Sequence, residues 1–234
     1  MAFQNISDYV AAIGALGTAA YGLVDASKAF GGGVSNIGFH RIEAAIRKLF
    51  PTEKDDAQNP LPLRDLIATL RANWLNGTAL ADQKSIAKTL IKLRITAKNA
   101  KDLAARTGVD KDKLIAVATN LAEGGDFTDE LKNVLGRFDL ILTALLDEAY
   151  QRADQAYRNA AKAWSVLASV LLAVFGSAVV WNLGASPGDW GKWGMEDLPV
   201  AILVGLLATP LAPVSKDLAS ALTTAVKSMQ ILKR

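Results

Sequence analysis

Two long apolar segments dominate the hydropathy pattern of the chain. They run from Trp164 to Leu183 and from Leu198 to Val214, and neither contains Lys, Arg, Asp, Glu or His. The loop from Gly184 to Asp197 separates them. Uncharged apolar segments of about this length are typical of helices that cross a bilayer. The pattern therefore predicts a transmembrane hairpin.

A shorter apolar segment, rich in Ala and Gly, lies near the N-terminus at Tyr9–Val24. The residues before it carry no Lys or Arg, whereas a secretory signal peptide normally begins with basic residues. A helix of this length reaches about 24 Å, less than the roughly 30 Å hydrocarbon core. We therefore expect a short, uncleaved first membrane helix that packs against other parts of the protein.

The polar residues between these segments follow a helical period, and no strand-like alternation occurs. Asp110 is a candidate helix cap, with Val109 and Leu114 placed as a hydrophobic staple. The pattern predicts helices at Ser35–Phe50 (with Ile37, Ile42, Ala45, Ile46 and Leu49 on one face), Leu63–Leu75, Leu80–Arg106 and after Asp110.

One long helix is predicted from Thr128 onward, because no proline occurs before Pro187. Its apolar positions recur every three or four residues and become all alanine, as in a coiled-coil seam: Leu135, Phe138, Leu142, Leu145, Ala149, Ala153, Ala156, Ala160 and Ala163. We expect one continuous helix of about 55 residues and about 80 Å, rising from an aqueous domain into the bilayer.

These elements predict an all-α protein with three transmembrane helices and an inserted cytoplasmic helical domain. Four regions are expected: an N-terminal membrane helix with a glycine hinge (1–33), a helical domain (34–162), a transmembrane hairpin (163–214) and a C-terminal amphipathic helix (215–234, centred on Ser215–Leu232).

Charges flanking the apolar segments predict the orientation, because basic residues collect on the cytoplasmic side of a membrane. The loop 184–197 holds three acids and one lysine, whereas basic residues precede the hairpin and follow it. We expect the N-terminus and this loop outside, and the helical domain and C-terminus inside, in a bacterial-type inner membrane. Four tryptophans are the candidate interface anchors: Trp164, Trp181, Trp190 and Trp193.

Small residues recur every four positions in each apolar segment, a spacing that allows helix backbones to approach closely. They are Gly14, Thr18 and Gly22, then Ser165, Ser169, Ala173 and Ser177, then Ala201, Gly205 and Thr209. Packing within one protomer and packing between protomers explain these stripes equally well. Because three spans enclose little volume, a homo-oligomer is favoured. A pore lined by the Ser and Thr residues is an alternative.

Basic residues without an intervening acid occupy the segment 84–101: Lys84, Lys88, Lys92, Arg94, Lys98 and Lys101. The simplest interpretation is a solvated face opposite a core stripe of Ile86, Leu90 and Leu93. The functional alternatives are anionic lipid headgroups or an acidic protein partner. Nucleic acid ranks below them, because no aromatic residue interleaves with the lysines.

Composition narrows the chemistry. The chain has 234 residues, one His, no Cys and a net charge of +3, so it can form neither a disulfide nor a Cys/His zinc site. No nucleotide-binding or nucleophile motif is present. The carboxylates Asp139, Asp147, Glu148 and Asp154 are interpreted as salt-bridge partners, as in the i,i+4 pair of Glu148 with Arg152. No enzyme activity, cofactor or metal is expected.

The sequence thus favours a non-enzymatic membrane scaffold that displays a helical domain for assembly or partner recruitment. An oligomeric pore or gated channel is the alternative, and a membrane-tethered nucleic-acid binder is the third hypothesis.

Overall fold

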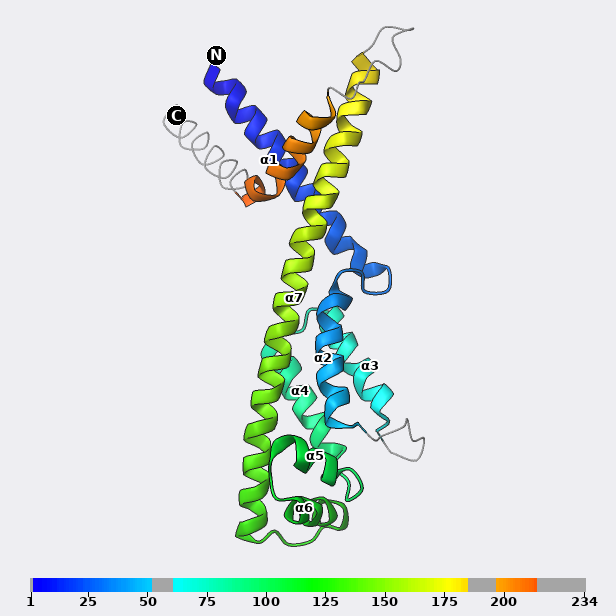
Figure 1. Ribbon diagram of the computed structural model, residues 1–234, viewed down its shortest axis with the longest axis vertical. Coiled ribbons are helices and arrows are strands. Elements are labelled where there is room, and N and C mark those ends of the chain that lie inside the picture. The colour runs from blue at the N-terminus through cyan, green and yellow to red at the C-terminus, as the bar shows by residue number, and fades with distance from the viewer. Residues whose placement is uncertain (1, 52–60, 185–196, 214–234) are drawn as a thin grey trace, which may run out of the picture. The chain divides into compact units, whose positions relative to one another are not determined.

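The computed structural model describes residues 2–51, 61–184 and 197–213, and within these ranges it is all-helical with no strand (Figure 1). The predicted all-α class is therefore confirmed. The elements are α1 (Ala2–Ala26), the 3-10 turn η1 (Ser27–Ala29), α2 (Ser35–Leu49), α3 (Leu63–Leu75), α4 (Leu80–Leu93), α5 (Ala100–Thr107), α6 (Lys111–Glu123), α7 (Asp129–Gly184) and a further helix, Leu198–Pro213.

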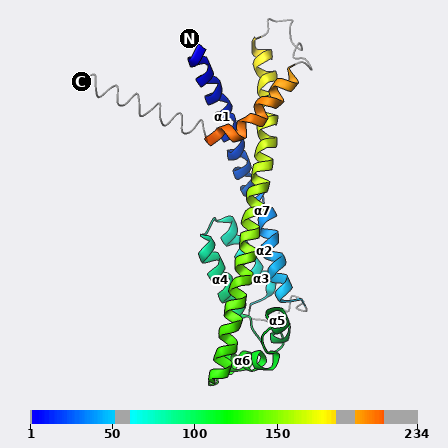
Figure 2. The same cartoon turned by 60° about the vertical axis from the view of Figure 1, so that its left-hand side comes forward.

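The chain divides into two compact units. Ser35–Tyr157 forms the first, which we call the core unit, and Met1–Val34 with Arg158–Arg234 forms the second, which we call the apolar unit. Both units draw on α7. Figure 2 shows the same helices from a second direction.

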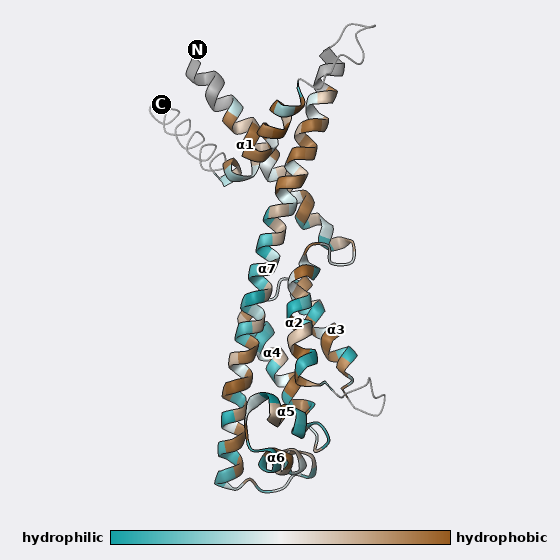
Figure 3. Ribbon diagram, viewed as in Figure 1, coloured by the Kyte–Doolittle hydropathy of each residue, from teal (hydrophilic) through white to brown (hydrophobic). Residues whose placement is uncertain are grey.

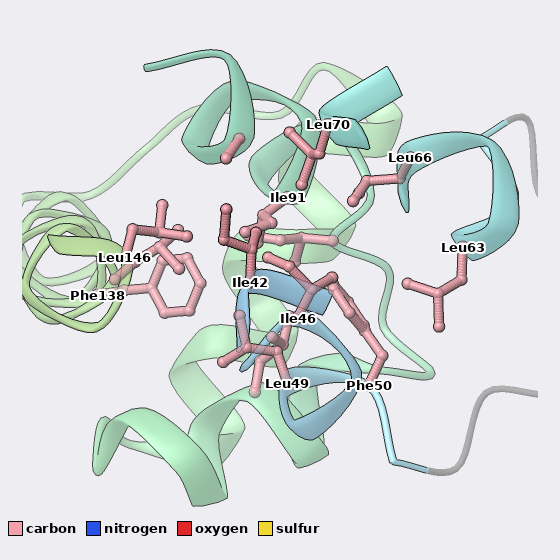
Figure 4. Close-up of a cluster of buried hydrophobic side chains, with 14 of the residues drawn as sticks. Ile42, Ile46, Leu49, Phe50, Leu63, Leu66, Leu70, Ile91, Phe138 and Leu146 are labelled. Atoms are coloured by element: carbon pink, nitrogen blue, oxygen red, sulfur yellow. The ribbon is translucent and has the colours of Figure 1, made fainter. Parts of the chain in front are cut away.

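The core unit is built around large aliphatic and aromatic side chains (Figure 4). Phe138 and Leu142 of α7 are fully buried, and so are Ile42 and Ile46 of α2. Helices α3 and α4 add a further set of buried side chains, which includes Leu63, Leu66, Leu70 and Ile91. The seam predicted on α7 therefore packs against helices of its own chain over this stretch.

Two apolar residues predicted on core faces are instead exposed. Ile37 is 42% exposed, because the face that α2 buries passes through Gly38 and Phe39. A Cβ at Gly38 would lie 2.6 Å from the Trp74 ring, so only glycine permits this approach. Leu93 is 71% exposed at the last residue of α4.

The helix predicted over Leu80–Arg106 is wrong: α4 ends at Leu93 and α5 begins at Ala100. Thr96 and Asn99 account for the break. The Thr96 backbone N–H donates to Asn99 Oδ1 (2.8 Å), and the Asn99 N–H donates to Thr96 Oγ1 (3.3 Å). Such local bonds compete with the helical ladder. In addition, Asn99 Nδ2 donates to the carbonyl of Arg94 (2.9 Å) and satisfies the end of α4.

Helix α7 is one element of 56 residues, as predicted, which corresponds to about 84 Å. Its first half alternates polar and apolar residues, and apolar residues dominate its second half (Figure 3).

Helix α1 has 25 residues and is longer than the predicted 16-residue segment, because it begins at Ala2, before the apolar segment starts. The predicted cap of α6 is confirmed: Asp110 Oδ1 accepts from the Lys113 N–H at 2.9 Å.

Candidate functional site

Helices α1 and α7 are each long and apolar enough to cross a membrane. In the most apolar stretch of 18 residues of each helix, only 17% is buried. The core helix of a soluble protein, by contrast, is mostly buried. Large exposed apolar side chains cover the second half of α7 and the helix Leu198–Pro213, among them Leu171 (61%), Phe175 (70%), Val200 (63%) and Leu203 (58%). These helices therefore present apolar surface outward.

The helix Leu198–Pro213 crosses α7 at Gly205. A Cβ at this glycine would lie 2.4 Å from the Cα of Val170, so the two backbones are in direct contact. Beside the crossing, the buried Ser169 hydroxyl lies 2.7 Å from the Gly205 carbonyl oxygen, to which it can donate, and 3.4 Å from Thr209 Oγ1. The structure thus brings together three of the predicted packing residues.

Helix α1 also contacts the helix Leu198–Pro213. The contact is made by Gly17, which was not among the predicted packing residues of α1. A Cβ at Gly17 would lie 2.1 Å from the Ala208 carbonyl oxygen. Gly14 and Ala20 are also buried, whereas Thr18 and Gly22 are exposed. A spacing of three residues therefore describes the packed face of α1 better than the spacing of four that sequence reasoning used, and the run Gly14, Gly17, Ala20 could have indicated it.

The remaining small residues have varied surroundings. Ser165, Ala173 and Ala201 are buried, and Ser177 is partly buried with its hydroxyl bonded to the Val174 carbonyl (2.9 Å). Ala173, Ser177 and Ala201 also line a groove of about 600 Å³ between α1, α7 and the helix Leu198–Pro213. Its lining is mostly apolar, with Tyr9 and Asp197 as further polar members.

Three lysines of α4 pair with carboxylates on α7. They are Lys84, Lys88 and Lys92, which we call the lysine stripe. Lys84 Nζ lies 2.5 Å from Asp147, and Asp139 accepts from Lys88 (3.2 Å) and Lys92 (3.0 Å). The stripe is therefore neutralised in part by its own chain. Sequence reasoning missed these partners, although the spacing held the signal: Lys84 to Lys92 and Asp139 to Asp147 are equal steps of two helical turns, which match when the helices run antiparallel.

The lysines also set the ionisation of Asp139. Its partial burial disfavours the charged form, but hydrogen bonds from Lys92 and Lys88 outweigh this effect, so the pKa of Asp139 is held below its usual value. Two nearby lysines without a fixed counter-charge would repel each other. Asp139 therefore holds α4 and α7 together at this point.

The other basic residues of the segment behave differently. Arg94 is buried, and its guanidinium lies 5.3 Å from the centre of the Phe50 ring, a cation–π contact. Lys98 and Lys101 are exposed. The six residues predicted as one basic surface therefore comprise three lysines that pair with α7, one buried arginine and two lysines with exposed side chains.

Only one of the four predicted tryptophan anchors has a described side chain. Trp164 is half exposed. The side chain of Trp181 lies outside the described part of the chain, as do Trp190, Trp193 and the predicted helix Ser215–Leu232. The predicted pair of Glu148 with Arg152 is confirmed at 2.8 Å. Among the described residues, no cluster of His, Asp and Glu side chains could hold a metal ion.

Comparison with protein-family models, with curated proteins and with solved structures finds no match. The function is therefore inferred from the surfaces of the chain itself.

Proposed function

We propose that this protein is an oligomeric integral membrane anchor, without enzymatic activity, that displays the core unit for assembly or partner recruitment. The observation that carries the proposal is the apolar surface exposed on α1, α7 and the helix Leu198–Pro213. Monomeric soluble proteins rarely expose large apolar patches, whereas a bilayer covers apolar helix surfaces.

In the proposed arrangement, three helices span a bacterial-type inner membrane, with the core unit and the C-terminus inside. The helix Leu198–Pro213 has 16 residues and reaches about 24 Å. Its contacts with α1 and α7 at Gly17 and Gly205 support a membrane position for it, because helices in lipid associate through small residues and van der Waals packing.

The absence of cysteine allows a direct test of membrane insertion and orientation. Single-cysteine variants Ser186→Cys, in the predicted outer loop, and Thr89→Cys, exposed on α4, are expressed in bacteria. We expect both to stay in the membrane fraction after carbonate washing. A membrane-impermeant maleimide should label Ser186→Cys in intact spheroplasts and Thr89→Cys only after permeabilisation. Extraction by carbonate, or labelling of Thr89→Cys from outside, would contradict the proposal.

The oligomer is supported by the small residues that the described packing leaves exposed. Thr18 and Gly22 face outward on α1, and a Cβ at Gly22 would meet nothing within 4 Å. A second copy can therefore approach this face closely. Native mass spectrometry in detergent is expected to find more than one copy in the parent protein and a smaller assembly for Gly22→Leu. A monomeric parent would rule out this part of the proposal.

No specific observation favours either alternative function, the pore or the nucleic-acid binder. Ser169 and Thr209 lie at a contact between helices of one protomer, so they do not favour a pore lining. The absence of ion flux in liposomes that contain the parent protein would remove that alternative. Lys84, Lys88 and Lys92 pair with Asp147 and Asp139, which gives no support to nucleic-acid binding.

A further inference from the structure

An open pocket of about 340 Å³, which we call the cavity, lies at the surface of the core unit between α2, α5 and α7. Four of its lining side chains are basic and one is acidic: Arg41 and Lys48 from α2, Arg106 from α5, and Glu148 and Arg152 from α7. The rest of its lining, the apolar floor, comprises Ala44, Ala45, Ile46, Leu49, Leu145, Leu146 and Ala149. Figure 4 labels Ile46, Leu49 and Leu146. The cavity thus combines an apolar floor with a cationic edge.

The positive charge of this cavity is only partly balanced by the protein. Glu148 pairs with Arg152 at 2.8 Å. Within residues 2–51, 61–184 and 197–213, no ion pair neutralises Arg41, Lys48 or Arg106. This distinguishes the cavity from the lysine stripe on α4, where Asp139 and Asp147 supply the counter-charge.

Helix ends account for only part of this charge. Lys48 and Arg106 lie in the last turns of α2 and α5, where the negative end of the helix dipole stabilises a cation. Each dipole end amounts to about half a unit charge, so two ends offset about one of the cations. Arg41 lies in the second turn of α2, away from either end. A surplus of positive charge therefore remains for a ligand.

We propose that this cavity binds an organic phosphate: a phosphate monoester whose apolar substituent packs on the floor formed by Ala45, Leu145 and Ala149. A phosphate monoester carries about −1.5 to −2 charge at pH 7, which matches this surplus better than one carboxylate does. Guanidinium groups also pair with phosphate through two parallel hydrogen bonds. The volume lies at the small end of ligand pockets, so a compact substituent fits.

This inference is independent of the membrane proposal, because every residue of the cavity belongs to the core unit. The ligand could be a soluble metabolite or the headgroup of a phosphate-bearing lipid. Both present the same chemistry to Arg41 and Arg106.

The test uses the full chain in uncharged detergent with phenyl phosphate as the probe, followed by isothermal titration calorimetry. We expect saturable binding, tighter than that of inorganic phosphate or phenol. Arg41→Gln and Arg106→Gln should each weaken it about tenfold, since each removes a charge-assisted contact. Arg137→Gln is the matched control, because Arg137 is an exposed arginine of α7 that does not line the cavity. It should leave the affinity unchanged.

A second variant distinguishes the contribution of the apolar floor to binding from that of the basic side chains. Ala45→Leu fills the cavity without altering any cation, so it should weaken phenyl phosphate while leaving inorganic phosphate unchanged. Phosphatidic acid added to the micelles identifies the source of the ligand: competition indicates a lipid headgroup, its absence indicates a soluble phosphate, and either result supports the site.

Three results would overturn the proposal. They are the absence of saturable binding of phenyl phosphate, equal losses for Arg137→Gln and Arg41→Gln, or equal affinity for phenol and phenyl phosphate.

Discussion

The two units of this protein bury different kinds of side chain, although α7 supplies residues to both. In the core unit, α7 buries Phe138, Leu142 and Tyr150. In the apolar unit, it buries Ser165, Ser169 and Ala173, while its large residues Leu171 and Phe175 are exposed. Water drives large apolar groups into a core, whereas in lipid they can remain outside and small residues make the helix contacts. One helix therefore carries two inverted burial patterns.

The largest expected effect comes from the same substitution made in the two halves of α7. Phe138→Ala removes a fully buried ring and should destabilise the core unit by about 3–5 kcal/mol. Phe175→Ala removes a ring that is 70% exposed and should change the stability by less than about 0.5 kcal/mol. Urea denaturation of both variants in detergent provides the measurement. Equal losses would mean that Phe175 is buried by protein and not by lipid.

The close approach of backbones in the apolar unit predicts the next effect. Gly205→Ala places a Cβ 2.4 Å from the Val170 Cα, so one helix must shift, at a cost of about 1–3 kcal/mol. Gly176→Ala on α7 is the control, because its Cβ would meet nothing within 4 Å. Thermal melting in detergent should show a lower Tm for Gly205→Ala alone. If the two variants melt alike, the helices do not cross at Gly205.

Ion pairing in the core unit predicts a smaller effect that depends on pH. The pKa of Asp139 is lowered in the folded state, so its charge stabilises the fold above the unfolded pKa of about 3.9, and this contribution disappears as the pH falls through the folded pKa. Asp139→Asn should cost about 0.2–1 kcal/mol at pH 7, and its difference from the parent should narrow below about pH 4.

Asp129→Asn serves as the comparison for this pair, because the Asp129 side chain is 95% exposed. Urea midpoints across pH 3–7 should show a smaller loss for Asp129→Asn. A loss for Asp139→Asn that persists unchanged at low pH would show that the Lys88 and Lys92 pairs do not cause it.

The sequence was most informative where the pattern is periodic and local. The bounds of α3, the length of α7 and the Asp110 cap all follow from apolar spacing or from turn chemistry. The break at Thr96 and Asn99 was missed because the apolar period runs through it, while two polar side chains redirect the backbone. Helical period alone cannot weigh that competition.

Sites assembled from several helices were predicted less completely. Gly205, Ser169 and Thr209 were identified individually, but Gly17 as the contact on α1 was not, since the choice of face depends on the partner helix. The cavity residues Arg41, Arg106 and Arg152 come from three helices distant in sequence. No local sequence pattern links these residues, so only the tertiary structure shows that they line one cavity.

A further small effect is predicted for two buried serines one turn apart on α7. The Ser169 hydroxyl can bond to the Gly205 carbonyl at 2.7 Å, whereas the Ser165 Oγ has no hydrogen-bond partner among the described residues. Ser169→Ala should therefore cost about 0.6 kcal/mol, the average for such bonds between helices in lipid. Ser165→Ala removes an unsatisfied buried hydroxyl and should be neutral or stabilising. Melting in detergent ranks the pair, and a greater loss for Ser165→Ala would place a partner for that hydroxyl on a second copy of the chain.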